Sequence, residues 1–190
     1  MTLPDPQAFK RLREEYAHED KKREYTIKQS RVVAKKSKHA IYLVHEQKYS
    51  QAKQQLQAAA QTRQEIHAQG DAKQPSYTQA LEEYVEAAAL LAFMQEESLP
   101  TEQDLEVDAQ TYLAGLADLT GELLRAATRA AIQEDDQFIT RVRDFIDALH
   151  GELLQIPLRN NHVRKKADSV KYHLQKIEHL QYETALRRKN

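Results

Sequence analysis

The sequence predicts an all-α fold, a bundle of six or seven helices in a single domain that spans residues 1–190. Four Gly and five Pro among 190 residues are too few for a turn-rich β architecture. Apolar residues recur at helical spacing over long stretches, and no run of Val, Ile or Thr alternates as a strand would. With 41% hydrophobic residues, a chain of this length can form one core.

The first helical pattern opens at Asp5 or Pro6 and meets no Gly or Pro before Gly70. This length predicts either one very long helix or two to three helical segments. Residues 70–76 form the first clear loop: Gly70 suits the position after a helix end, Pro75 stops the chain, and Ser76 caps the next helix.

The helix expected at residues 77–97 is apolar over a wide face, which is typical of a helix buried on more than one side. After it, Thr101 and Asp104 have the spacing of a capping box and predict a short turn. Asp108 is expected to cap a helix that runs to about Ala131.

Two more helices complete the chain. The acidic residues 134–136 mark the start of a helix that reaches about Gln155, and Pro157 closes it. The final helix is expected from about Asn160 to Arg188, with its apolar residues on one side and most of its Lys and Arg on the other.

The net charge of −1 conceals an uneven distribution of charge along the chain. Residues 10–53 hold 13 Lys or Arg and 6 acids, and residues 159–190 hold 9 and 3, whereas residues 74–124 hold 11 acids and no Lys or Arg. If basic helices pack beside an acidic one, the basic side chains can neutralise the phosphates of a bound polyanion, and the carboxylates can hold a divalent cation.

Two absences exclude further classes of protein. The chain has no Cys, which removes disulfide frameworks, thiolate zinc sites and a Cys nucleophile. Neither a run of 18 apolar residues nor an apolar stretch after a basic N-terminus occurs, so we expect no membrane span, no secretory signal and a cytoplasmic protein.

Two pairs of acids have the spacing of a shared helix face. Glu83 and Glu86 are three residues apart, and Asp118 and Glu122 are four apart. Like charges at this spacing destabilise a helix by a few tenths of a kcal/mol, so a bound cation is one explanation and a solvated surface is the other.

Gly115 and Gly121 lie inside the helix that carries the second acidic pair. An interior Gly costs about 0.5 to 1 kcal/mol relative to Ala. We therefore expect another helix or a ligand to approach closely at these positions.

Several segments together resemble the translin family, in particular translin-associated factor X: DAQTYLAGLADLTGELLRAATRAA, LEEYVEA, KQSRVVAKKSKHAIYLVH and VRKKADSVKYHLQKIEHLQYE. The resemblance covers most of residues 18–189, and the two acidic motifs are its most specific part. It implies an all-helical fold, assembly of about eight subunits into a hollow homo-oligomer, and Mg²⁺-dependent endonuclease activity on single-stranded RNA.

The family's catalytic acids, carried over one by one, fall on Glu83, Glu86, Asp118 and Glu122. Their carboxylates are expected to bind one or two Mg²⁺ or Mn²⁺ ions, which activate water and stabilise charge at a phosphate. One departure lies upstream of Glu83, where two uncharged residues offer no further carboxylate.

Basic side chains near these acids are the candidates for holding RNA. Four are spaced as one stripe on the first helix: Lys28, Arg31, Lys35 and Lys38. Arg125 and Arg129 continue the face of Glu122 on the acidic helix. An ordinary solvated or intersubunit face is the alternative for each of them.

Other functions remain open. In a non-catalytic helical assembly that binds single-stranded RNA or DNA, the acids would be structural, and a scaffold would have no nucleic-acid role. Glu15 and His18 form one Glu-x-x-His motif, whereas a di-iron bundle needs two. We interpret His39 and His45 as core or surface residues rather than metal ligands.

Overall fold

The computed structural model describes residues 5–159 and 162–187, and within these ranges it contains six α-helices and no strand. The helices are α1 (Pro6–His45), α2 (Tyr49–Gln69), α3 (Pro75–Met94), α4 (Ala109–Ile132), α5 (Asp136–Gln155) and α6 (His162–Arg187). The all-α prediction is confirmed. The expected ends of the last helix, Asn160 and Arg188, lie outside the described residues.

The long N-terminal helical pattern divides at Gln47, where the sequence has neither Gly nor Pro. Gln47 has a φ of 58°, in the left-handed region. The amide of Lys48 donates to the carbonyl of Leu43 at 2.9 Å, so the turn satisfies a carbonyl that the end of α1 leaves free. The chain then reverses into α2.

Most of the predicted caps are present. The carboxylates of Asp108 and Asp135 accept amide hydrogen bonds at the starts of α4 and α5. The prediction for Ser76 is wrong, because α3 already begins at Pro75, with Gln74 as its N-cap. Proline suits this first helical position, since its fixed φ is helical and no amide is needed there.

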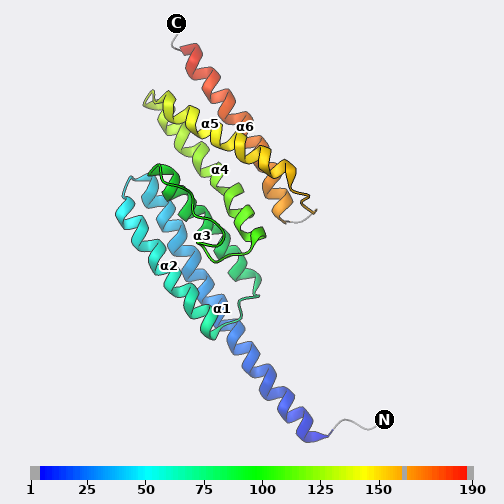
Figure 1. Ribbon diagram of the computed structural model, residues 1–190. Coiled ribbons are helices and arrows are strands. Elements are labelled where there is room, and N and C mark those ends of the chain that lie inside the picture. Colours follow the sequence, from blue (N-terminus) through cyan, green and yellow to red (C-terminus); the bar gives the residue numbers. More distant parts are fainter. Residues whose placement is uncertain (1–4, 160–161, 188–190) are drawn as a thin grey trace.

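The helices pack in an order that follows the chain (Figure 1). The helix α1 contacts both α2 and α3, α3 contacts α4, and α4 and α5 both contact α6. The N-terminal part of α1 extends away from the other helices, and the C-terminal part of α6 projects at the opposite end (Figure 1). The central position in this order belongs to α3 and α4.

Helix α3 is buried on more than one side, as its wide apolar face predicts. Thirteen of its 20 residues are buried, among them Val85 and Leu90, which are fully covered. Burial of an aliphatic side chain of this size contributes about 1.5 to 3 kcal/mol. The acids of α3 are therefore held on a backbone fixed by the core.

No described helix is both long and apolar enough to cross a membrane.

Candidate functional site

A cavity of about 490 Å³ lies where α1, α3, α4 and α6 meet. It brings together all four acids that the sequence indicates, two from each of the central helices. Besides Glu83, Glu86, Asp118 and Glu122, the lining consists of Lys38, Ile41 and Tyr42 of α1, Arg125 of α4 and His173 of α6. Acids that are 32 to 39 residues apart in sequence thus share one cavity because α3 and α4 pack against each other.

Three of the four acids have basic partners. Lys38 Nζ lies 3.0 Å from Glu83 Oε1. Asp118 Oδ2 accepts a hydrogen bond from Lys166 of α6. Glu122 Oε2 accepts one from His45 Nε2 and lies 3.4 Å from Arg125 Nη1. The hydrogen bond from His45 is the largest cause of the lowered pKa of Glu122, which keeps this acid ionised.

Glu86 is the exception among the four. It is only 9% exposed and has no hydrogen bond or ion pair with another described residue. Its pKa is raised to about 8, chiefly by burial and then by the negative charges of Asp118, Glu83 and Glu122, whereas the positive charge of Lys166 lowers it by less. The cavity therefore lacks positive charge at Glu86.

Sequence reasoning missed Glu82, although Glu82 and Glu86 are themselves four residues apart. The Glu82 side chain is 5% exposed. Its Oε2 accepts hydrogen bonds from Lys166 Nζ at 2.8 Å and from His162 Nε2 at 3.0 Å. Lys166 thus bridges Glu82 on α3 and Asp118 on α4. Burial lowers the pKa of Lys166, but the hydrogen bonds to Asp118 and Glu82 outweigh it and the pKa is raised.

Two histidines also belong to the site. The His45 side chain is 3% exposed and bonded to Glu122, so it is a buried histidine as expected, yet one that contacts a site acid. His173 lines the cavity, and its Nδ1 lies 2.7 Å from Thr120 Oγ1. Burial, with a smaller contribution from Lys176, lowers the pKa of His173, so its imidazole is neutral at pH 7.

The six predicted basic residues do not gather in one place. Lys38 and Arg125 line the acidic cavity. Arg129 does not line it; its Nη1 donates to the carbonyl of His45, the last residue of α1, at 3.4 Å. Arg31 and Lys35 line a different cavity between α1 and α2. Lys28 is exposed on α1 and lines neither cavity.

The donor atoms at the acidic cavity suit a hard divalent cation. Carboxylate oxygens are the ligands that Mg²⁺ and Mn²⁺ prefer, and Glu86, which has no basic partner, is available to such a cation. Within residues 5–159 and 162–187, however, no three acidic or histidine side chains converge closely enough to form a metal-binding group. Asp118, Glu122 and Glu83 instead face the basic side chains described above.

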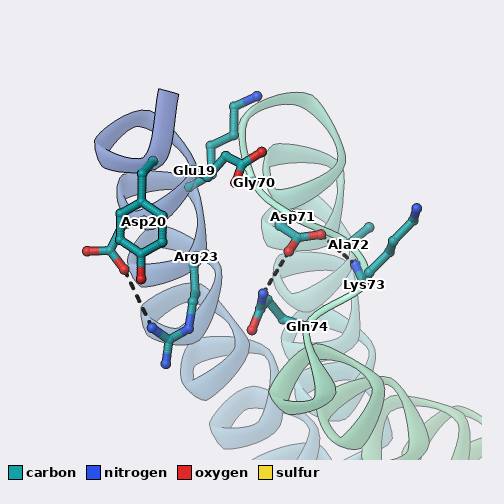
Figure 2. Close-up of a pocket in the computed structure, with 10 residues that line it drawn as sticks. Glu19, Asp20, Arg23, Gly70, Asp71, Ala72, Lys73 and Gln74 are labelled. Atoms are coloured by element: carbon teal, nitrogen blue, oxygen red, sulfur yellow. Dashed lines mark hydrogen bonds and ion pairs between the residues drawn. The ribbon is translucent and has the colours of Figure 1, made fainter. Parts of the chain in front are cut away.

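A separate cavity of about 540 Å³ lies between α1 and the loop that joins α2 to α3 (Figure 2). Its polar side chains largely satisfy one another. Asp71 accepts hydrogen bonds from the Gln74 side chain at 2.7 Å and the Lys73 amide at 3.0 Å, and Arg23 pairs with Asp20 (Figure 2). None of the acids or bases that the sequence singled out lies here.

Comparison with known proteins supplies independent information. The profile of the Translin family matches residues 21–188. Translin of Gallus gallus is 31% identical over 86 residues, which cover 45% of this chain and 38% of that protein. Translin of Homo sapiens is 26% identical over 121 residues, which cover 56% of this chain and 53% of that protein. The chain thus spans about half or less of the length of these curated relatives.

Solved structures resemble the chain over nearly its whole length. The crystal structure of apo-NeC3PO superposes with a TM-score of 0.86 at 26% identity and covers 97% of this chain and 99% of that chain. The structure of an AfC3PO–duplex RNA complex superposes with a TM-score of 0.80 at 25% identity and covers 97% of each chain.

Proposed function

Since this chain belongs to the Translin family, we propose that it is an endoribonuclease that depends on Mg²⁺ or Mn²⁺ and cuts single-stranded RNA. We further propose that it works as a hollow homo-oligomer of about eight copies. The similarity to AfC3PO, which has been solved with duplex RNA, supports binding of RNA by this chain.

The observation that carries the proposal is the convergence of four carboxylates on one cavity with a deficit of positive charge at Glu86. With a pKa of about 8, the Glu86 carboxyl keeps its proton at pH 7 when no cation is present, and a divalent cation would displace that proton and supply the partner that Glu86 lacks. Burial at this position is better explained by a site whose occupant is positively charged.

In the proposed mechanism, Glu83, Glu86, Asp118 and Glu122 hold the cation. A divalent cation in this position supplies activation of water and neutralisation of charge at the phosphate. The bond from His45 keeps Glu122 ionised, and the Lys166 bridge fixes Asp118 against α3. Lys38 is paired with Glu83 and 65% exposed, so its ammonium would be available to a phosphate of the strand once a cation neutralised Glu83.

Basic and aromatic groups at the mouth of the cavity are suited to hold the RNA strand. Arg125 is about half exposed, so its guanidinium can reach a phosphate while it lies near Glu122. Tyr42 is 54% exposed and lines the same cavity, where its ring can stack on an unpaired base. Flexible single strands enter a hollow particle more readily than a stiff duplex.

Cleavage of labelled RNA with Mg²⁺ or Mn²⁺ tests the proposal. Wild-type protein should cut single-stranded RNA, whereas Asp118→Asn and Glu122→Gln should bind the strand without cutting it. Glu65→Gln, which changes an exposed acid on α2, is the matched control and should cut normally. Cutting that persists in either site variant would remove the carboxylates from the mechanism. Light scattering that shows a monomer at micromolar concentration would remove the oligomer.

One observation favours a second candidate, a non-catalytic oligomer that binds single-stranded RNA or DNA. Asp118, Glu122 and Glu83 each already contact a basic side chain, as structural acids do. Under this alternative, the wild-type protein binds the strand equally well with and without divalent cations and does not cut it. The same labelled strands, measured by fluorescence anisotropy with EDTA and with Mg²⁺, separate the two candidates.

A further inference from the structure

His173 lies on α6, a helix that contributes none of the four acids, yet it lines the cavity in which they converge. It stands against the surface of α4 at Gly121. A Cβ built on Gly121 would be 3.4 Å from His173 Cε1 and 3.8 Å from Nε2. Gly121 lies three residues after Asp118 and therefore shares a face of α4 with it, and the charge of Asp118 acts on the His173 ring.

Hydrogen bonds to Thr120 determine which nitrogen of His173 carries the proton. Thr120 Oγ1 lies 2.6 Å from the Ala117 carbonyl oxygen, an acceptor to which the hydroxyl must donate its one hydrogen. The same Oγ1 can then only accept from His173 Nδ1, at 2.7 Å. In the neutral ring, Nδ1 therefore carries the hydrogen and Nε2 carries a free lone pair.

Nε2 has no hydrogen-bond partner among the described residues. A neutral imidazole that donates through one nitrogen to a fixed acceptor and presents the other to a cavity has the arrangement of a metal-binding histidine. The chain Ala117–Thr120–His173 holds the ring orientation before any cation arrives.

On this geometry, and building on the function proposed above, we propose that His173 Nε2 is a ligand of the divalent cation held by the carboxylate cavity. A nitrogen ligand among carboxylates shifts the preference of a site from Mg²⁺ toward Mn²⁺ and Co²⁺. His173 is thus the residue that makes this site select its metal.

The experiment uses the full chain loaded with Mn²⁺ and observes pulsed electron paramagnetic resonance. The wild-type protein should show ¹⁴N modulation from a coordinated imidazole. In His173→Asn the amide can retain the hydrogen bond to Thr120 while Nε2 is lost, so the modulation should disappear. Calorimetric affinity for Mn²⁺ should fall by roughly 10- to 100-fold, and affinity for Mg²⁺ by less.

The matched control is His179→Asn, which changes an exposed histidine on the same helix that pairs with Glu183. It should leave both the modulation and the affinity unchanged. A wild-type protein that binds Mn²⁺ without ¹⁴N modulation, or modulation that survives in His173→Asn, overturns the assignment. The wild-type spectrum decides this even if the variant fails to fold.

Failure of this inference is distinguishable from failure of the proposed function. Wild-type protein that shows the nitrogen coupling but does not cut RNA supports the His173 ligand and overturns the nuclease. Wild-type protein that cuts RNA with Mn²⁺ but shows no coupling overturns the ligand and supports the nuclease.

Discussion

Gly115 of α4 lies directly against Val85 of α3. A Cβ built on Gly115 would stand 2.6 Å from Val85 Cβ and 2.8 Å from the Glu82 carbonyl oxygen, which is closer than two such atoms can approach. Val85 follows Glu82 by three residues and directly precedes Glu86, and Asp118 follows Gly115 by less than one turn. The missing side chain at Gly115 therefore sets the separation of the acids on α3 from those on α4.

We expect Gly115→Ala to destabilise the protein, because overpacking at a backbone contact costs about 1 to 3 kcal/mol and exceeds the gain in helix propensity. Urea denaturation measures the change. Gly151→Ala is the matched control: it lies inside α5 with no atom within 4 Å of the built Cβ, and should stabilise by about 0.5 to 1 kcal/mol. Equal stabilisation by both substitutions would contradict the close contact.

The two interior glycines of α4, Gly115 and Gly121, show what the sequence can predict about packing and what it cannot. Their energetic cost predicts close approach at Gly115 and Gly121. The structure has it at Gly115, where a Cβ would collide with α3, whereas a Cβ on Gly121 would make only an ordinary contact with the His173 ring. Which element approaches cannot be read from the spacing, because helical periodicity describes one helix at a time. The partner helices, α3 and α6, are determined by tertiary packing.

The pKa of Glu86 predicts how stability depends on pH. The carboxyl ionises near 4.5 when unfolded and near 8 when folded, so the unfolded state loses its proton first and stability falls as pH rises between these values. Glu86→Gln removes this loss. We expect equal stability of variant and wild type at pH 4, and a more stable variant at pH 8, by a few kcal/mol.

Urea denaturation from pH 4 to pH 8.5 without divalent cations tests this expectation. Glu65→Gln, at an exposed position on α2, should show no such divergence from the wild type. A Glu86→Gln protein that is less stable at every pH would show that Glu86 is ionised and satisfied in the folded state.

Lys166 should be essential for stability, because its loss leaves the buried Glu82 carboxylate with only His162 as a partner. Removal of one partner from a buried ion pair costs about 3 to 5 kcal/mol, and we expect Lys166→Met to cost somewhat less because Lys166 is 20% exposed. Addition of Glu82→Gln should recover much of the loss. Lys165→Met, at the exposed neighbouring position, is the control. Additive effects of the two site changes would contradict the direct pairing.

Lys166 and Glu82 also mark the limit of sequence reasoning at the site. The motif LEEYVEA offers Glu83–Glu86 at three residues and Glu82–Glu86 at four, and spacing alone does not separate a cavity acid from a buried ion-paired acid. Their distinction comes from Lys166, which is 84 residues from Glu82 and forms an ion pair with Glu82 but not with Glu86. The four cavity acids, by contrast, lie in two pairs whose spacing predicts a shared helix face, and they line one cavity.

The turn between α1 and α2 predicts a stabilising substitution. Gln47 occupies a left-handed conformation that costs a residue with a side chain about 1 kcal/mol or more. This residue carries no turn-forming signature, which explains why the sequence did not locate the break. Gln47→Gly should stabilise by about 0.5 to 1 kcal/mol, whereas Gln57→Gly, exposed within α2, should destabilise by about 1 kcal/mol. Thermal denaturation of both variants checks the difference in sign.

Tyr42 should contribute to RNA binding through its exposed ring at the cavity. The ring lies beside the His39 ring, with centroids 6.4 Å apart, and its outer part is open to a base. Loss of one stacked base costs about 1 to 3 kcal/mol, and we expect Tyr42→Ala to weaken binding of single-stranded RNA accordingly. Fluorescence anisotropy in the Asp118→Asn background measures binding without cleavage. Tyr182→Ala, equally exposed but outside the cavity, should bind as the parent does, and an equal loss in both variants would show that RNA is not held at this cavity.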